Sequence, residues 1–210
     1  TNPPGTDATG PWRQIFGAYA VSCGVTKTGE TYCWGANDRG QLGDGTQIQR
    51  NAPTKVATTE RFVTITGDRY TVCGVTEAGD VYCWGFTAGT VAPTPRLVQP
   101  GLRARDVAVT DVSACALGTD GVVSCWSATG APPARPTPVS ATLRFRAIAG
   151  AEGRFCAVAV SGDAYCWTAD DDAAVGAVTR QPAGPPFVSI ATGGGAALGT
   201  PSTLHACGLT

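Results

Sequence analysis

The chain has 210 residues, of which 15% are charged, and its formal net charge is −1 at pH 7. This balance lacks the basic surface that nucleic-acid binding requires, and no apolar run approaches the roughly 18 residues of a membrane span. The 28 glycines and 15 prolines are spread along the chain, which is typical of many short strands joined by turns. The lack of methionine indicates a processed or trimmed N-terminus.

The chain begins with a Pro/Gly-rich stretch, TNPPGTDATGP, over residues 1–11. We predict an extended segment here, with Trp12 as a candidate anchor on a partner. A lipidated cysteine directly before Thr1 would make this segment a membrane tether.

Four segments then repeat one pattern of cysteine, glycine and tryptophan: VSCGVTKTGETYCWG, TVCGVTEAGDVYCWG, SACALGTDGVVSCWS and RFCAVAVSGDAYCWT. In each segment a glycine follows the first cysteine at a fixed distance, and a tryptophan follows the second cysteine directly. A period-2 run precedes each segment and a Pro-containing stretch follows it, which gives units of about 40–50 residues. Short strands repeated at this period predict the blades of a β-propeller.

The last stretch, FVSIATGGGAALGTPSTLHACGLT, begins a fifth unit, because HACGLT matches VSCGVT. We therefore predict a single propeller domain over residues 12–210. Its repeats are expected at approximately 12–60, 61–101, 102–142, 143–185 and, in part, 186–210. Cys207 is left unpaired, so its partner lies beyond the present end or belongs to another chain.

The cysteine spacing predicts a disulfide within each complete unit. If Cys23 and Cys33 flank a hairpin that turns at residues 27–30, they face each other across the ladder. Directly opposed residues have Cα atoms about 4.5–5.5 Å apart, which a disulfide tolerates. The predicted pairs are Cys23–Cys33, Cys73–Cys83, Cys115–Cys125 and Cys156–Cys166. Free buried thiols and a metal site are the alternatives, but zinc favours shorter spacings and more histidine.

Two further groups of residues follow from the hairpin geometry. The predicted turn glycines, where φ must be positive, are Gly29, Gly79, Gly121 and Gly162. The predicted structural aromatics, which fill the space between sheets, are Tyr32, Trp34, Tyr82, Trp84, Trp126, Tyr165 and Trp167. We expect Gly24 and Gly74 to leave room for Tyr32 and Tyr82. Four disulfides would place the protein outside a reducing cytosol.

The stretch GANDRGQLGDGT after YCW, preceded by CGVTKTGETY, resembles the repeat of the RCC1 (regulator of chromosome condensation) family. The resemblance covers about residues 12–208, is strong in the first repeat, and loses the GQLGDGT segment in the third and fourth. It implies an all-β propeller with four strands per blade: four complete blades, a partial fifth and disulfide-stapled hairpins. The family commonly has about seven blades. The paired cysteines resemble those of the secreted bacterial branch.

No catalytic, metal or cofactor site is predicted. His205 is the only histidine and does not by itself indicate a catalytic triad. No nucleophile elbow is present. The acidic run at 168–173 lacks the alternating oxygens of a calcium loop and is predicted to be a solvated loop. Asx-type turns account for Asp38 and Asp44.

Several segments are candidate contact surfaces, because loops commonly carry function. The blades differ most after each tryptophan, at 86–95, 127–136 and 168–178, and in the insertion GGGAALGTPSTL. The basic residues of RARD (103–106) and RFR (144–146) alternate, so they form either a solvated strand edge or a patch that contacts a protein or an anion.

These features predict a non-enzymatic, protein-binding scaffold outside the cytosol, which is periplasmic, on the outer surface or secreted. It could be an extrinsic subunit docked on a larger, membrane-associated assembly, reaching the membrane only through a partner or a lipid tether. The alternative hypothesis is a secreted binding module that inhibits an enzyme or binds carbohydrate. A lectin would repeat its sugar site in each blade, whereas these loops diverge. A hydrolase would need convergent acids and bases, and the sequence offers none.

Overall fold

The computed structural model describes residues 12–87, 89–128, 135–170, 174–182, 186–193 and 205–209, without the side chains of residues 192, 193 and 205–208. The described residues form strands and connecting turns but no helix, and therefore no helix that could cross a membrane.

The strands form four antiparallel sheets of four strands each and one two-stranded sheet. The first sheet contains β1 (Trp12–Ala18), β2 (Val21–Thr26), β3 (Thr31–Gly35) and β4 (Arg50–Lys55). The second contains β5 (Phe62–Gly67), β6 (Thr71–Thr76), β7 (Val81–Thr87) and β8 (Thr90–Leu97). The third contains β9 (Ala104–Val109), β10 (Ser113–Gly118), β11 (Val123–Ser127) and β12 (Thr137–Pro138). The fourth contains β13 (Phe145–Ala151), β14 (Arg154–Ala159), β15 (Ala164–Thr168) and β16 (Thr179–Arg180), and the last pairs β17 (Ser189–Gly193) with β18 (His205–Leu209). The predicted all-β propeller fold is confirmed.

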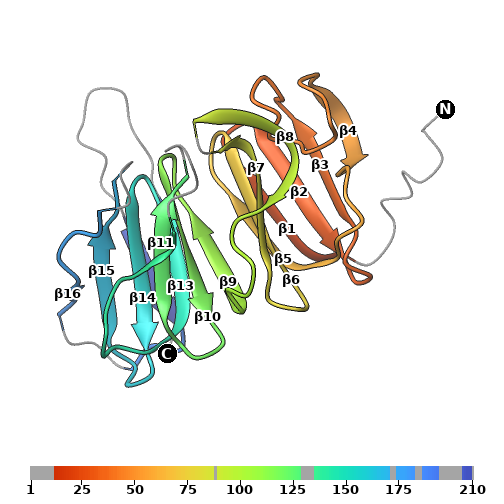
Figure 1. Ribbon diagram of the computed structural model, residues 1–210. Helices are drawn as coiled ribbons and strands as arrows, with labels where there is room; N and C mark the ends of the chain where they lie inside the picture. The colour runs from red at the N-terminus through yellow and green to blue at the C-terminus, as the bar shows by residue number, and fades with distance from the viewer. Residues whose placement is uncertain are drawn as a thin grey trace, which may run out of the picture.

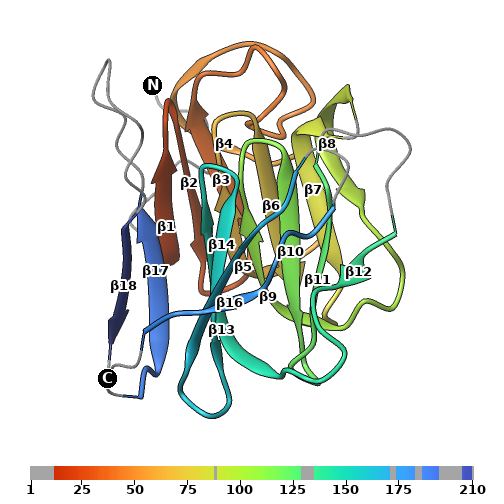
Figure 2. The same ribbon diagram turned by 90° about the vertical axis from the view of Figure 1, so that its left-hand side faces the viewer.

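The first strand of each sheet lies on the inside of the assembly. Consecutive inner strands contact each other in the order β1, β5, β9, β13 and β17, and the sheets radiate outwards from them (Figures 1 and 2). A cavity of about 380 Å³ runs between the inner strands and is lined by residues of all five, among them Gln14, Ile65, Asp106, Ile148 and Ile190. This cavity is the central channel of the propeller.

The predicted hairpin register is present in every complete blade. Cys23 pairs with Cys33 and Ser22 with Trp34 in the first blade, and the same pairing recurs in the other three. Four disulfides join the opposed cysteines, with Cα–Cα distances of 4.0–4.1 Å. The disulfide-stapled hairpins are therefore a feature of the fold.

Each interface between complete blades packs a disulfide of one blade near a tryptophan of the next. Successive residues of a strand point to opposite faces of the sheet, so the cysteine and the following tryptophan face different neighbours. Trp84 lies in one buried cluster with Cys23 and Cys33 of the preceding blade. Trp126 shares a cluster with Cys73 and Cys83, and Trp167 shares one with Cys115 and Cys125. Trp34 is only half-buried, because no described blade precedes the first.

The turn glycines also link each blade to the next. Gly29, Gly79, Gly121 and Gly162 have φ between 81° and 94°. Their carbonyl oxygens accept hydrogen bonds of 2.8–3.0 Å from the backbone N–H groups of Phe62, Ala104, Phe145 and Phe187. A Cβ added to any of the four would lie 2.6–3.2 Å from the residue just before that donor. The turn and the start of the next blade are thus one packed unit.

Three expectations are wrong in detail. The space next to Gly24 is occupied by Trp12, two of whose ring atoms would lie 2.7 Å from an added Cβ, and not by Tyr32. Trp12 is therefore part of β1, edge-on to Tyr32 at 6.0 Å, rather than the end of a tether. Phe62 takes the equivalent place next to Gly74. Arg103 does not alternate with Arg105 on one strand, because it precedes β9 with a φ of 51°.

Candidate interaction surface

One end of the propeller carries the variable loops, and we call it the loop rim. It consists of the turns between the first and second strands of each blade and the segments that follow each tryptophan. Backbone hydrogen bonds join the two sets, from Ala36 N–H to Ala20 O, from Phe86 N–H to Tyr70 O, and from Ala128 N–H to Val112 O. The tight glycine turns lie at the opposite rim, because adjacent hairpins of an antiparallel sheet turn at opposite ends.

A row of alternating aromatic and arginine side chains crosses the loop rim from the first blade to the second. The Arg69 guanidinium lies 4.4 Å from the centre of the Tyr19 ring and 4.9 Å from that of Tyr70. Arg39 lies 5.8 Å from the Tyr70 ring and 5.4 Å from the Phe86 ring. All four distances are within the range of a cation–π interaction. We call this row the cation–π row.

The backbone presents this row to solvent. Tyr19 is 80% exposed and has a φ of 52° in the turn between β1 and β2, a conformation uncommon for residues other than glycine. Arg69 and Arg39 are also exposed. An exposed aromatic held by arginines loses little side-chain freedom when a partner covers it. Tyrosine and arginine are also enriched among the residues that dominate protein interfaces.

The β3–β4 loop, which contains GANDRGQLGDGT, is built by its own buried polar side chains. The Asn37 Oδ1 accepts from Leu42 N–H at 2.9 Å, and its Nδ2 donates to the carbonyl oxygens of Thr46 and Ile48 at 3.1 Å. Leu42 is fully buried between the first two blades. The loop is therefore mainly structural, and it holds Arg39 in place at the rim.

Asp44 stabilises the same loop through charge. Its side chain is 3% exposed and accepts from Arg50 Nε at 2.8 Å and from Thr46 N–H at 2.9 Å. Burial by itself would raise the pKa of Asp44, but the hydrogen bonds from Thr46 and Arg50 outweigh it and hold the pKa below its usual value. Asp44 forms the predicted Asx-type turn. Asp38 instead accepts from the Gln41 side chain at 3.0 Å.

Acidic residues surround the inner part of the loop rim. Asp68, Asp111 and Glu152 occupy the first turns of the second, third and fourth blades. Burial raises the pKa of Asp68, a hydrogen bond from Arg69 N–H opposes this, and the negative charges of Asp111 and Glu152 raise it further. Within the described residues no group of three His, Cys, Asp or Glu side chains could hold a metal ion.

The predicted contact segments are described only in part. Residues 86–95 form the β7–β8 hairpin, apart from residue 88. Residues 129–134, 171–173 and 194–204 lie outside the described residues, and these include the second half of the acidic run and most of the insertion. His205 and Cys207 lie on β18, with Cys207 opposite Ala191, but the structure does not describe their side chains.

The basic runs lie at the starts of inner strands. Arg105 donates to the Phe145 carbonyl of the next blade at 3.0 Å. Arg144 is exposed, precedes β13 and donates to the Leu143 carbonyl at 2.9 Å. Arg105 thus joins the third blade to the fourth, a role that neither hypothesis for these basic runs included.

Sequence reasoning missed the residues of the cation–π row in the first turns of the blades. The prediction looked for variation after each tryptophan, whereas Tyr19, Arg69 and Tyr70 precede the first cysteine of their repeats. One sequence signal could have revealed them. Large aromatic and arginine residues occupy the turns between β1 and β2 and between β5 and β6, where small polar residues are usual.

Comparison with known proteins agrees with this architecture. Residues 28–73 match the family model of the regulator of chromosome condensation (RCC1) repeat. No curated protein sequence matches the chain. Human WBSCR16 is similar in structure, with a TM-score of 0.74 and 17% identity over 88% of this chain and 56% of its own.

Two further solved structures are similar. Prp20 of Saccharomyces cerevisiae, studied for its binding to Gsp1p and histones, has a TM-score of 0.65 and 20% identity, over 85% of this chain and 53% of its own. The ectodomain of the receptor kinase CR4 from Physcomitrella patens has a TM-score of 0.55 and 20% identity, over 77% of this chain and 40% of its own. The chain therefore spans about half the length of the structures it resembles, and the likeness is one of fold.

Proposed function

Since the chain contains RCC1-like repeats and folds as an RCC1-type propeller, we propose that it is a non-enzymatic scaffold that binds a protein partner through its loop rim. The observation that carries this proposal is the cation–π row. Its exposed tyrosine and arginines span two blades, and Arg39 is carried by a loop whose own polar side chains are hydrogen-bonded within the loop. Such a surface is pre-organised for contact.

The proposed setting is an oxidising compartment outside the cytosol. Four disulfides, each within a hairpin, are typical of secreted, periplasmic or cell-surface proteins. The structural likeness to a receptor ectodomain supports this setting by analogy of fold. We further propose that the protein is an extrinsic subunit of a larger, membrane-associated assembly.

A retention experiment tests the proposal. The oxidised protein is immobilised and incubated with the extracytoplasmic fraction of its source, and retained proteins are quantified by mass spectrometry. We expect a partner retained by the wild type and by a control variant, Lys27→Ala, which removes an exposed cation from the opposite rim. The Arg39→Ala/Arg69→Ala variant should retain at least about tenfold less, as loss of interface hot spots does. Equal retention by all three proteins would overturn the proposal.

The identity of the partner separates the alternatives. A retained enzyme whose activity falls on binding would favour the inhibitor hypothesis. Elution of the partner by a simple sugar would favour carbohydrate recognition.

A further inference from the structure

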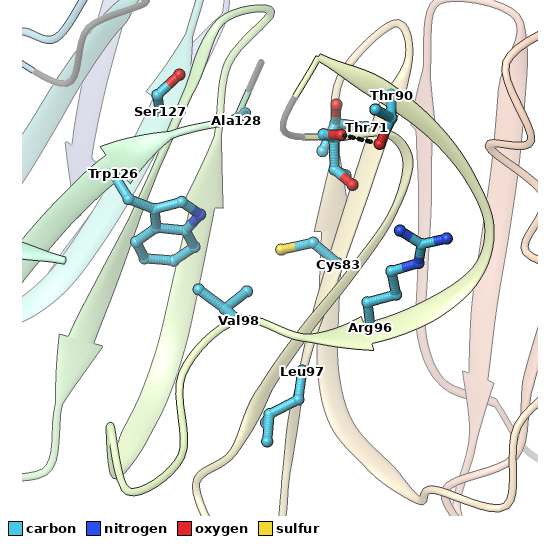
Figure 3. Close-up of a pocket in the computed structure, with 10 residues that line it drawn as sticks. Thr71, Cys83, Thr90, Arg96, Leu97, Val98, Trp126, Ser127 and Ala128 are labelled. Atoms are coloured by element: carbon cyan, nitrogen blue, oxygen red, sulfur yellow. Dashed lines mark hydrogen bonds between the residues drawn. The ribbon is translucent and has the colours of Figure 1, made fainter. Parts of the chain in front are cut away.

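A second cavity, of about 220 Å³, lies between the β7–β8 hairpin and β11, where the second and third blades meet. Its residues are Thr71, Cys83, Thr87, Thr90, Arg96, Leu97, Val98, Trp126, Ser127 and Ala128. Figure 3 shows Trp126 on one wall, Arg96 within the arc of β8 on the other, and Cys83 and Val98 between them. The volume is below the roughly 300–1,000 Å³ of pockets for drug-sized ligands, so the cavity suits a side chain with a short piece of backbone.

The interface between the first two blades shows what fills this position. Trp84 is the counterpart of Trp126, because each directly follows the second cysteine of its repeat. Cys33 and Val56 line the space facing Trp84, as Cys83 and Val98 line the cavity facing Trp126. At the first interface, however, the GQLG segment of the β3–β4 loop inserts. Leu42 is fully buried there, and the Gln41 carbonyl accepts from Trp84 Nε1 at 3.0 Å.

The second blade lacks the inserting segment. Residues 36–49 lie between the paired residues Gly35 and Arg50 of the first blade. In the second blade, the chain instead turns back at once, with Thr87 paired to Thr90. No described residue of the β7–β8 hairpin takes the place of Leu42, and the cavity is the space that results.

Two polar groups at the cavity have no partner among the described residues. Trp126 is 3% exposed, its indole nitrogen points into the cavity in Figure 3, and it makes no hydrogen bond with the part of the chain that the structure describes. The Arg96 guanidinium likewise makes no hydrogen bond and no ion pair with the part of the chain that the structure describes. An indole N–H that opens onto a cavity without a protein partner favours an acceptor, and an exposed guanidinium without an ion pair favours a carboxylate.

We propose that this cavity binds a loop of a partner protein in the way that the first interface holds its own GQLG segment. The loop presents a leucine-like side chain to Trp126, Val98 and the Cys73–Cys83 disulfide. Its preceding carbonyl accepts from Trp126 Nε1, and an acidic residue beside it pairs with Arg96. This inference rests on the proposed function, because it names the chemistry of the partner.

A peptide that copies residues 37–46, NDRGQLGDGT, is the probe. The indole N–H signal of Trp126 is followed by two-dimensional NMR of the oxidised protein and assigned with Trp126→Phe. We expect a saturable shift of this signal. Replacing the peptide leucine by aspartate should weaken binding at least about tenfold, since a buried leucine is lost. Arg96→Ala should weaken it about two- to fivefold, whereas Arg154→Ala, on the fourth blade, should not.

A variant that fills the cavity separates a loss of binding from a loss of folding. Thr90 is exposed at the hairpin tip, so Thr90→Phe should leave the unfolding transition unchanged and abolish the shift. The proposal would be overturned if Thr90→Phe still bound the peptide, or if replacing the peptide leucine left the affinity unchanged. So would slow solvent exchange of the Trp126 indole N–H in the free protein, because residues of this chain would then cover the cavity. The assay needs no natural partner, so its failure is distinguishable from a failure of the retention experiment.

Discussion

Replacing Gly79 by alanine should test whether the turn glycines join the blades. Gly79 has a φ of 86°, and an added Cβ would lie 2.9 Å from Arg103 Cα and 3.0 Å from the Ala104 carbonyl oxygen. A left-handed backbone costs a non-glycine residue about 1–2 kcal/mol. Forcing the backbone of the next blade aside costs about 1–3 kcal/mol more. We therefore expect the free energy of unfolding to fall by about 2–5 kcal/mol.

Gly101→Ala is the matched control for this change. Gly101 has a φ of 75°, but an added Cβ would meet nothing within 4 Å, so only the backbone cost of about 1–2 kcal/mol remains. Urea unfolding of the oxidised proteins, followed by tryptophan fluorescence and circular dichroism, measures both losses, provided the two signals coincide. The difference between the variants is the contribution of the blade contact. Equal losses would mean that the contact of Gly79 with the next blade contributes nothing to stability, contrary to this prediction.

Three other changes test separate parts of the structure. Cys73→Ala/Cys83→Ala opens a loop with a separation of 10 residues, so chain entropy predicts a loss of about 2.7 kcal/mol in urea unfolding; a loss below about 1 kcal/mol would contradict it. Asp44→Asn should cost about 2 kcal/mol at pH 7, because hydrogen bonds to a charged group are lost. The folded pKa of Asp44 lies below its usual 3.8, so its contribution is present above that pH and is lost as pH falls through the folded pKa. The gap to the wild type should therefore close in acid, and a gap constant from neutral pH to below pH 3.8 would refute the assignment. Arg39→Ala should lower the unfolding free energy by no more than about 1–2 kcal/mol, since exposed cation–π pairs are weak, and a larger loss would assign Arg39 to stability rather than binding.

The repeat made the architecture predictable from the sequence. Pairs such as Cys23 and Cys33 fix the register of a hairpin, because only directly opposed residues lie close enough to be joined. Once the register is known, the alternation of side chains places Trp34 and its counterparts on the opposite face. Local spacing therefore accounts for the hairpins, the turn glycines and the disulfides of the fold.

Contacts between repeats were not predictable in the same way. Whether Trp12 or Tyr32 lies next to Gly24 depends on how β1 sits on β2, and no spacing within the first hairpin determines that. The cation–π row joins Tyr19 to Arg69 and Arg39 across two blades, so it appears only when the blades are packed. The second cavity is recognised only when two interfaces between blades are compared. Leu42 fills the equivalent space at the first interface, and the sequence alone does not show that Leu42 is buried there.

Site-specific photo-crosslinking determines whether a protein partner binds at the loop rim. A benzophenone amino acid is placed either at Tyr19, which is 80% exposed on the loop rim, or at Lys27, which is exposed on the opposite rim. Each protein is irradiated in the extracytoplasmic fraction of its source. We expect a discrete crosslinked partner from position 19 and none from position 27. Crosslinks to the same proteins from both positions, or none from position 19, would contradict it.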